Sequence, residues 1–137
     1  MRIAIINGPN LNLLGTREPE VYGAQTFEQY YKELVKTYSG IDFHYFQSNV
    51  EGELVNELQR VGFSYDGILL NAAAYTHTSV AMGDAVAAIK TPVIEIHISN
   101  IAAREEYRLR SMIGAKSVGS ISGLGLKGYE LGLLYFL

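Results

Sequence analysis

One apolar segment in the second half of the chain carries three polar side chains that could do chemistry. Within 93–100 (VIEIHISN), Glu95, His97 and Ser99 are two residues apart, so they share one face of a β-strand. Polar groups on an otherwise apolar strand are costly to bury without partners. A carboxylate beside an imidazole can fix its tautomer and raise its pKa, a usual arrangement for a general acid. A buried, purely structural Glu–His pair is the alternative.

A second group of candidates lies in the long segment 7–23, which follows the first apolar run. Connections from a strand to a helix usually have about 2–6 residues, and longer ones are often lids or binding loops. Arg17 supplies a fixed cation and Tyr22 a phenol, whose charged form a nearby guanidinium favours. Alternatively, Arg17 is solvated and Tyr22 packs beneath the loop.

Two more segments supply hydrogen-bonding and cationic groups. In 71–79 (NAAAYTHTS), Asn71 and His77 are directional hydrogen-bond partners, and Ser79 is a candidate helix cap. The segment 100–110 contains three arginines that suit a hydroxylated or carboxylate ligand: Arg104, Arg108 and Arg110. The alternatives are a surface or capping histidine, and a solvated helix held by Glu–Arg pairs.

Composition narrows the class of protein. The 137 residues are 48% hydrophobic and 18% charged, which predicts one globular domain over 1–137 with a substantial core. A net charge of −3 without a basic block argues against nucleic-acid and anionic-membrane partners. No cysteine is present and the histidines lack the close spacing of metal ligands, so no metal site is predicted. The apolar run at 3–6 is too brief for a signal peptide or membrane span, which favours a cytoplasmic protein.

Strand-length apolar runs alternate with segments of helical period along the whole chain. The predicted strands are Arg2–Ile6, Ile41–Gln47, Gly67–Leu70, Val93–Ser99 and Lys116–Ile121. The predicted helices are Thr26–Tyr38, capped by Thr26 and Glu28, then Gly52–Val61, Val80–Ile89 and Tyr129–Phe136. Alternation with strands apolar on both faces predicts an α/β fold, a flavodoxin-like three-layer sandwich with a five-stranded parallel sheet. Ligands of such folds bind at the carboxyl ends of the strands, where the candidate residues fall.

Taken together, these segments resemble the type II 3-dehydroquinate dehydratases, in order and over nearly the whole chain. The matching pieces are Asn7–Gly15 with Arg17 and Tyr22, Asn71 with Ala74–Ser79, His97–Ile101 with Ala103–Glu105 and Arg108, and Gly123–Gly125 with Gly128 and Tyr129. Two departures stand out: the family usually has Pro-Gly or Pro-Ala where this chain has Ala72-Ala73, and often a histidine where it has Ala102.

The resemblance implies a cofactor-free anti-dehydration of 3-dehydroquinate to 3-dehydroshikimate through an enolate, the third step of the shikimate pathway. It implies Tyr22 as the base, made a phenolate by Arg17, under a lid at about 8–23. The other implied roles are the acid His97 oriented by Glu95, the enolate stabiliser Asn10, and the substrate binders Asn71, His77, Ile98, Ser99 and Arg108. It further implies a dodecamer, a tetramer of trimers, in which Asp84 reaches the active site of a neighbouring subunit.

Three other readings fit the residues less well. A flavin or nucleotide binder needs a hydroxyl- and glycine-rich phosphate loop after the first strand, and 9–14 (PNLNLL) is a poor one. A phospho-receiver domain needs an aspartate at the end of the third strand, where this chain has Asn71. A Schiff-base lyase needs a desolvated lysine, and no lysine falls at the ligand-facing strand ends.

Overall fold

The sheet has five parallel strands in the order β2-β1-β3-β4-β5. The computed structural model describes residues 1–16, 20 and 24–137. Its strands are β1 (Arg2–Asn7), β2 (Asp42–Gln47), β3 (Gly67–Asn71), β4 (Val93–His97) and β5 (Gly119–Ser122). This order is the flavodoxin-like one, so the predicted sheet is confirmed.

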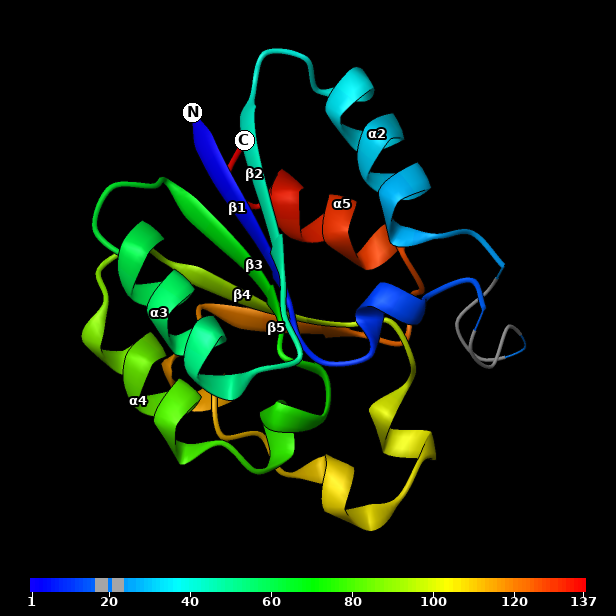
Figure 1. Cartoon of the computed structure of the whole chain (residues 1–137), viewed down its shortest axis with the longest axis vertical. Helices are drawn as coiled ribbons and strands as arrows, with labels where there is room; N and C mark the ends of the chain where they lie inside the picture. Colours follow the sequence, from blue (N-terminus) through cyan, green and yellow to red (C-terminus); the bar gives the residue numbers. More distant parts are fainter. Residues whose placement is uncertain (17–19, 21–23) are drawn as a thin grey trace.

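Helices cover both faces of the sheet (Figure 1). The helices of one face are α3 (Glu51–Val61) and α4 (Val80–Ala88), and those of the other are α2 (Phe27–Thr37) and α5 (Lys127–Leu134). No helix among the described residues is long and apolar enough to cross a membrane. The three-layer arrangement follows from the central strands β1, β3 and β4, which are buried on both faces of the sheet, whereas β2 and β5 at its edges are more exposed.

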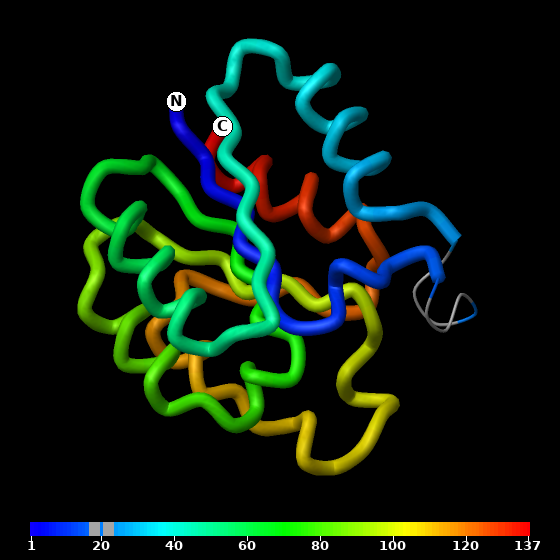
Figure 2. The backbone as a smooth tube through the Cα atoms, viewed as in Figure 1, coloured from blue at the N-terminus to red at the C-terminus, as the bar shows by residue number. Residues whose placement is uncertain are grey.

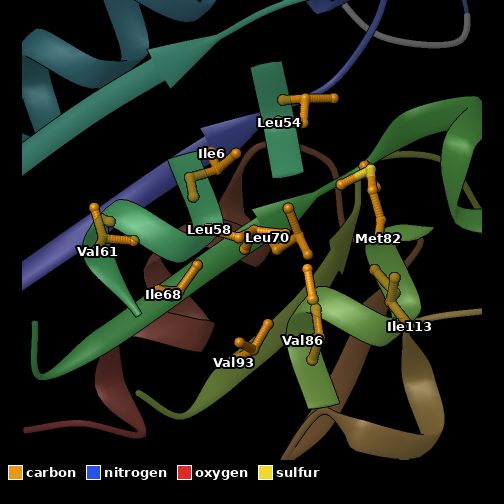
Figure 3. Close-up of a cluster of buried hydrophobic side chains, with 13 residues drawn as sticks. Ile6, Leu54, Leu58, Val61, Ile68, Leu70, Met82, Val86, Val93 and Ile113 are labelled. Atoms are coloured by element: carbon orange, nitrogen blue, oxygen red, sulfur yellow. The ribbon is translucent and has the colours of Figure 1, made fainter. Parts of the chain in front are cut away.

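The core is divided into two clusters by the sheet. Figure 3 shows the cluster under α3 and α4, in which Leu54, Leu58 and Met82 pack on the β-strands. The second cluster lies under α2 and α5 and includes the fully buried rings of Phe27 and Tyr129. Both clusters hold the strands rigidly, and the strand ends are therefore fixed platforms for functional side chains.

Some predicted boundaries were wrong by a few residues. β4 ends at His97, so Ser99 lies in the bend beyond the strand rather than in it. The fifth strand begins at Gly119 rather than Lys116, because Gly114–Lys116 forms a short 3₁₀ turn. The last helix begins and ends about two residues earlier than predicted, at Lys127–Leu134.

The cap of α2 differs from the prediction in one partner. Thr26 accepts a hydrogen bond from the Gln29 backbone, and the Gln29 side chain accepts one from the Thr26 backbone at 3.0 Å. The capping box therefore uses Gln29, while Glu28 places its charge in the first turn, where it suits the helix dipole. The predicted cap of α4 is confirmed, because Ser79 Oγ accepts from the Met82 backbone at 2.9 Å.

Short 3₁₀ turns follow the carboxyl ends of the three central strands. They are η1 (Leu11–Leu13) after β1, η2 (Ala73–His77) after β3, and η3 (Ile101–Ala103) and η4 (Glu106–Leu109) after β4. Figure 2 shows the chain after β4 running out beyond the sheet before it returns to β5. These turns gather the candidate residues at one edge of the sheet.

The turns after β1 and β3 come into backbone contact through Gly8. Its N–H donates to the Asn71 carbonyl at 2.7 Å. A Cβ on Gly8 would lie 2.5 Å from the Ala72 carbonyl oxygen, so no residue with a side chain fits there without a backbone shift. The glycine thus allows the two loops to form one wall.

Candidate functional site

The predicted pairing of Glu95 and His97 is present. The side chains project from the same face of β4, and the His97 Nε2 atom lies 2.5 Å from Glu95 Oε2. Glu95 is 2% exposed and His97 5% exposed, so the pair is shielded from water. Because a carboxylate oxygen only accepts, the imidazole N–H on Nε2 must be the donor, and the ring presents Nδ1 on its other side.

A second imidazole lies beside the first. The rings of His77 and His97 are close to parallel, with centroids 6.1 Å apart. His77 Nδ1 lies 2.8 Å from the Arg110 carbonyl, so Nδ1 carries the proton and the neutral ring has an acceptor at Nε2. Burial, together with the charges of His97 and Arg108, lowers the pKa of His77. The ring is therefore a neutral hydrogen-bonding group near neutral pH.

Both rings line a pocket at the carboxyl ends of β1, β3 and β4. Its volume is about 110 Å³, several times the space of one ordered water, which is about 10–15 Å³. Its lining combines amide, imidazole, hydroxyl and guanidinium groups with a few apolar ones: Pro9, Asn10, Leu11, Asn71, Ala73, Ala74, His77, His97, Ile98, Ser99, Ile101, Arg104 and Arg108. A small ligand rich in oxygen atoms matches this lining.

Asn71 is held by a buried chain of hydrogen bonds. Its Nδ2 donates to the Tyr129 hydroxyl at 2.9 Å, and that hydroxyl donates to Asn7 Oδ1 at 2.7 Å. Asn71 Oδ1 accepts from the Ala73 backbone at 3.1 Å. Each of these groups has a fixed donor or acceptor role, so the orientation of the Asn71 amide is determined.

The backbone of Asn10 is held by a hydrogen bond to Asn49. It has a left-handed φ of 70°, which asparagine tolerates better than most residues. Its N–H donates to Asn49 Oδ1 at 3.0 Å, and the Asn49 carbonyl accepts from the Tyr75 hydroxyl at 2.8 Å. Asn49 therefore ties the turn after β1 to the turn after β3.

The cationic side of the pocket is formed by Arg104 and Arg108. Arg104 Nη1 donates to Ser99 Oγ at 3.2 Å, and Arg108 Nε donates to Glu105 Oε2 at 2.6 Å. The Tyr107 hydroxyl and Arg108 lower the pKa of Glu105 to about 2. Burial disfavours the charge of Arg108, but the Glu105 carboxylate outweighs it and the pKa of Arg108 is raised. Both partners are thus charged.

Most predicted site residues meet at this pocket. Seven line it: Asn10, Asn71, His77, His97, Ile98, Ser99 and Arg108. Glu95 lies behind His97 rather than in the lining. Asp84 is exposed on α4 and is absent from the lining, and the predicted Arg17 and Tyr22, with most of the second half of the predicted lid, lie outside the described residues.

Some groups at the site were missed by the sequence reasoning. Ser111 donates to Glu95, Tyr129 orients Asn71, and Asn49 holds Asn10. Of these three residues, only Tyr129 could have been found from the sequence, because it belongs to the family resemblance near the end of the chain. Among the described residues, no group of three or more His, Cys, Asp or Glu side chains is arranged to hold a metal ion.

Comparison with known proteins gives the family. The family Dehydroquinase class II matches residues 1–137. The chain is 50% identical to a 3-dehydroquinate dehydratase of Bacillus licheniformis, over 98% of this chain and 94% of that protein. It is 48% identical to one of Aliarcobacter butzleri, over 98% of this chain and 83% of that protein.

A solved structure agrees with the sequence comparison. The type II dehydroquinase of Butyrivibrio crossotus superposes with a TM-score of 0.93 at 41% identity, covering 99% of this chain and 97% of that one. The chain described here belongs to the class II dehydroquinase family.

Proposed function

We propose that the pocket at the ends of β1, β3 and β4 is the active site in which this lyase of the class II dehydroquinase family converts 3-dehydroquinate to 3-dehydroshikimate, a step of the shikimate pathway. In this proposal residues 1–137 form a single catalytic domain, the reaction needs no cofactor, and it takes place in the cytoplasm. The observation that carries it is the buried Glu95–His97 pair opening onto a pocket of oxygen-binding groups.

We assign the acid to His97. The dehydration needs a base for the proton on C2, a stabiliser for the enolate oxygen on C3, and an acid for the hydroxyl leaving C1. The Glu95 carboxylate at 2.5 Å accepts the Nε2–H of His97 and orients the ring, which leaves Nδ1 as the atom that can carry a proton to the substrate. The lowered pKa of His77 makes this neighbouring ring a poor alternative acid.

The base in this proposal is the Tyr22 phenolate, stabilised by Arg17. Its oxygen takes the C2 proton, and the electron pair of the C–H bond forms the enolate, which the Asn10 amide stabilises. The ketone at C3 then re-forms and the enolate electron pair makes the C1=C2 double bond as the C1–O bond breaks, and His97 donates the proton that makes the leaving hydroxyl water. Tyr22 is left protonated and His97 neutral, and return of one proton from phenol to imidazole restores the starting state.

The substrate binders complete the assignment. Asn71, His77 and Ser99 present polar groups to a ligand that carries several hydroxyls, and Arg108 suits its carboxylate. The Ile98 carbonyl accepts from the Gly125 N–H at 3.0 Å, which fixes the backbone of this wall. These roles are supported by the fact that all of these substrate binders line the same pocket.

Addition of 3-dehydroquinate to the purified protein tests the proposal. We expect a rise in the ultraviolet absorbance of a conjugated enone, with a chelator present. Tyr22→Phe should abolish turnover while substrate still binds in calorimetry, and His97→Ala should reduce kcat at least about 100-fold. Tyr135→Phe is the matched control, since this ring is 60% exposed and does not line the pocket. Wild-type kcat in Tyr22→Phe would contradict the assignment of Tyr22 as the base. An adduct trapped by borohydride would indicate a Schiff-base mechanism on a lysine instead.

We also propose that Asp84 acts in the site of a neighbouring subunit of a dodecamer built from trimers. Asp84 is exposed on α4, outside the pocket of its own chain. The rest of that exposed helix surface is apolar: Val80, Ala81, Ala87 and Ala88. A helix surface of this composition suits burial against another chain better than exposure to water.

A mixing experiment distinguishes action within one chain from action between chains. Asp84→Ala and His97→Ala should each be nearly inactive, whereas refolding an equal mixture should restore part of the activity, since hybrid assemblies contain sites with both native groups. Sedimentation should find an oligomer of three or a multiple of three chains. A fully active monomer contradicts the shared site.

A further inference from the structure

The Glu95 carboxylate has two side-chain partners within the part of the chain that the structure describes. One is His97, and the other is Ser111, whose Oγ lies 3.1 Å from Oε1 and 3.0 Å from Oε2. No lysine or arginine forms an ion pair with Glu95 within those residues. A buried charge with so few partners depends strongly on each of them.

The direction of the Ser111 hydroxyl is fixed by its second contact. Its oxygen accepts the Gly114 N–H at 2.9 Å. A carboxylate cannot donate, so the single hydroxyl proton of Ser111 points to Glu95. The hydroxyl therefore donates to the Glu95 carboxylate, whose Oε2 also accepts the His97 N–H.

Gly114 makes room for this contact. A Cβ at position 114 would lie 2.9 Å from Glu95 Oε1 and 3.1 Å from Ser111 Oγ. Such distances are too short for a side-chain carbon beside a polar oxygen, so one of the two groups would move. The contact between Ser111 and Glu95 thus depends on a residue without a side chain at position 114.

The segment around Ser111 is anchored to the other histidine. The Arg110 carbonyl accepts from His77, and the Met112 N–H donates to the Thr76 carbonyl at 2.7 Å. The segment 110–114 is therefore linked to both histidines. The Arg110 carbonyl binds His77 directly, and the Ser111 hydroxyl binds Glu95, the partner of His97. A single segment sets the relative placement of the two rings.

From this geometry we infer that Ser111 is a positioning residue of the dehydration, which holds the Glu95 carboxylate so that the His97 ring stays aimed into the pocket. The inference rests on the role proposed above for His97. Ser111 itself does not line the pocket, so it acts through Glu95 rather than on substrate. Loss of the Ser111 hydroxyl therefore lowers the rate of proton donation by His97 and leaves the affinity for substrate unchanged.

Ser111→Ala tests the inference. We expect kcat to fall about 10-fold or more, because a hydrogen bond to a charged group is lost, while KM changes less than about 2-fold. In proton NMR, the His97 Nε2–H signal should be shifted downfield and protected from exchange in the wild type, and weakened or lost in the variant. Only three histidines contribute signals, so assignment with His97→Ala is direct.

Ser117→Ala is the matched control. Its hydroxyl donates to the Ile113 carbonyl at 2.9 Å in the same segment and has no contact with Glu95. It should keep the wild-type kcat and the protected His97 proton. If Ser111→Ala fails to fold, Gly114→Ala decides instead, because it keeps every polar side chain and only displaces the contact.

Two different results separate the inference from the proposal beneath it. Wild-type kcat in His97→Ala would refute His97 as the acid, whatever Ser111 does. An inactive His97→Ala combined with wild-type kcat and an unchanged His97 proton signal in Ser111→Ala, or in Gly114→Ala, would overturn the role of Ser111 alone.

Discussion

The two histidines of the pocket have opposite electrostatic surroundings despite the 6.1 Å between their rings. His97 has a buried carboxylate as partner, whereas His77 has a backbone carbonyl and lies near the cations of the pocket. Burial and the nearby charges of His97 and Arg108 outweigh the Arg110 carbonyl and the Glu95 carboxylate, so the pKa of His77 is lowered. One ring is suited to proton donation and the other to binding.

The Glu95 charge can be removed with little change in shape. We expect Glu95→Gln to lower kcat about 100-fold, the lower range for loss of general acid catalysis, with KM nearly unchanged. Steady-state kinetics with 3-dehydroquinate measures both. Glu106→Gln, an isosteric change at an exposed position of η4, should behave as wild type. Equal kcat values in the two variants would mean that the carboxylate is structural.

Ala73 is strained where it lines the pocket. Its φ is 53°, in the left-handed region, which a glycine at the same position would adopt without strain. For a residue with a Cβ this conformation costs about 1–2 kcal/mol. The Asn71 side chain, which accepts the Ala73 N–H, holds the strained turn in place.

Relief of that strain should stabilise the protein. We expect Ala73→Gly to raise the free energy of unfolding by about 0.5–1 kcal/mol, because the relieved strain exceeds the added flexibility of the unfolded chain. Urea unfolding followed by circular dichroism measures it. Ala74→Gly, one residue on without a positive φ, should instead destabilise. A loss of stability in Ala73→Gly would contradict strain at this turn.

At the scale of elements, α5 is joined to the ends of two strands by one hydroxyl. Tyr129 is fully buried, and its oxygen accepts from Asn71 at the end of β3 and donates to Asn7 at the end of β1. A helix on one face of the sheet thereby determines the orientation of an amide in the pocket. Packing and site geometry are coupled at this residue.

Removal of the hydroxyl leaves both asparagines unsatisfied. We expect Tyr129→Phe to lower the free energy of unfolding by about 1–3 kcal/mol, since a buried amide and a buried carbonyl lose their partner. It should also raise KM, because the Asn71 amide is no longer held. Urea unfolding and steady-state kinetics measure the two effects. Tyr135→Phe, a change at an exposed ring that caps the C-terminal end of the same helix, should change neither.

The elements were predictable because their signals are local. Apolar runs, Thr26, Ser79 and the turn residues after β1 act within a few positions of themselves. The start of β5 was not predictable, because it depends on where Gly119 meets Ile94 of β4. Ser111 and Tyr129 were missed for the same reason: their contacts span 16, 58 and 122 residues, and no local pattern records them.

At the scale of the whole molecule, one face of the sheet is covered by an aromatic layer. The Phe27 ring lies within 6.5 Å, centroid to centroid, of each ring around it: Tyr30, Tyr31, Tyr45 and Tyr129. Burial raises the pKa of Tyr30 and of Tyr45 to about 12, and it raises the pKa of Tyr129 further. These hydroxyls remain neutral in the folded protein where ordinary tyrosines ionise.

Stability should therefore fall in alkali. Between about pH 10 and 12 the unfolded chain loses protons from these tyrosines while the folded protein retains them, so the unfolded state is increasingly favoured as pH rises. Urea unfolding midpoints should decline steadily across this range and be little affected by these groups below it. Tyrosinate absorbance in the native protein should lag behind that of a urea-unfolded sample. Coincident titration curves would contradict the burial of these hydroxyls.

Every strand pairing in the sheet is parallel, which has a consequence for how the chain acquires its structure. A parallel pair cannot nucleate from a tight hairpin, and each one waits for a long crossover connection to collapse. Contacts between segments so distant in sequence form slowly, on the order of milliseconds to seconds. The pocket needs the ends of three such strands, so recovery of catalysis should be among the last events of refolding.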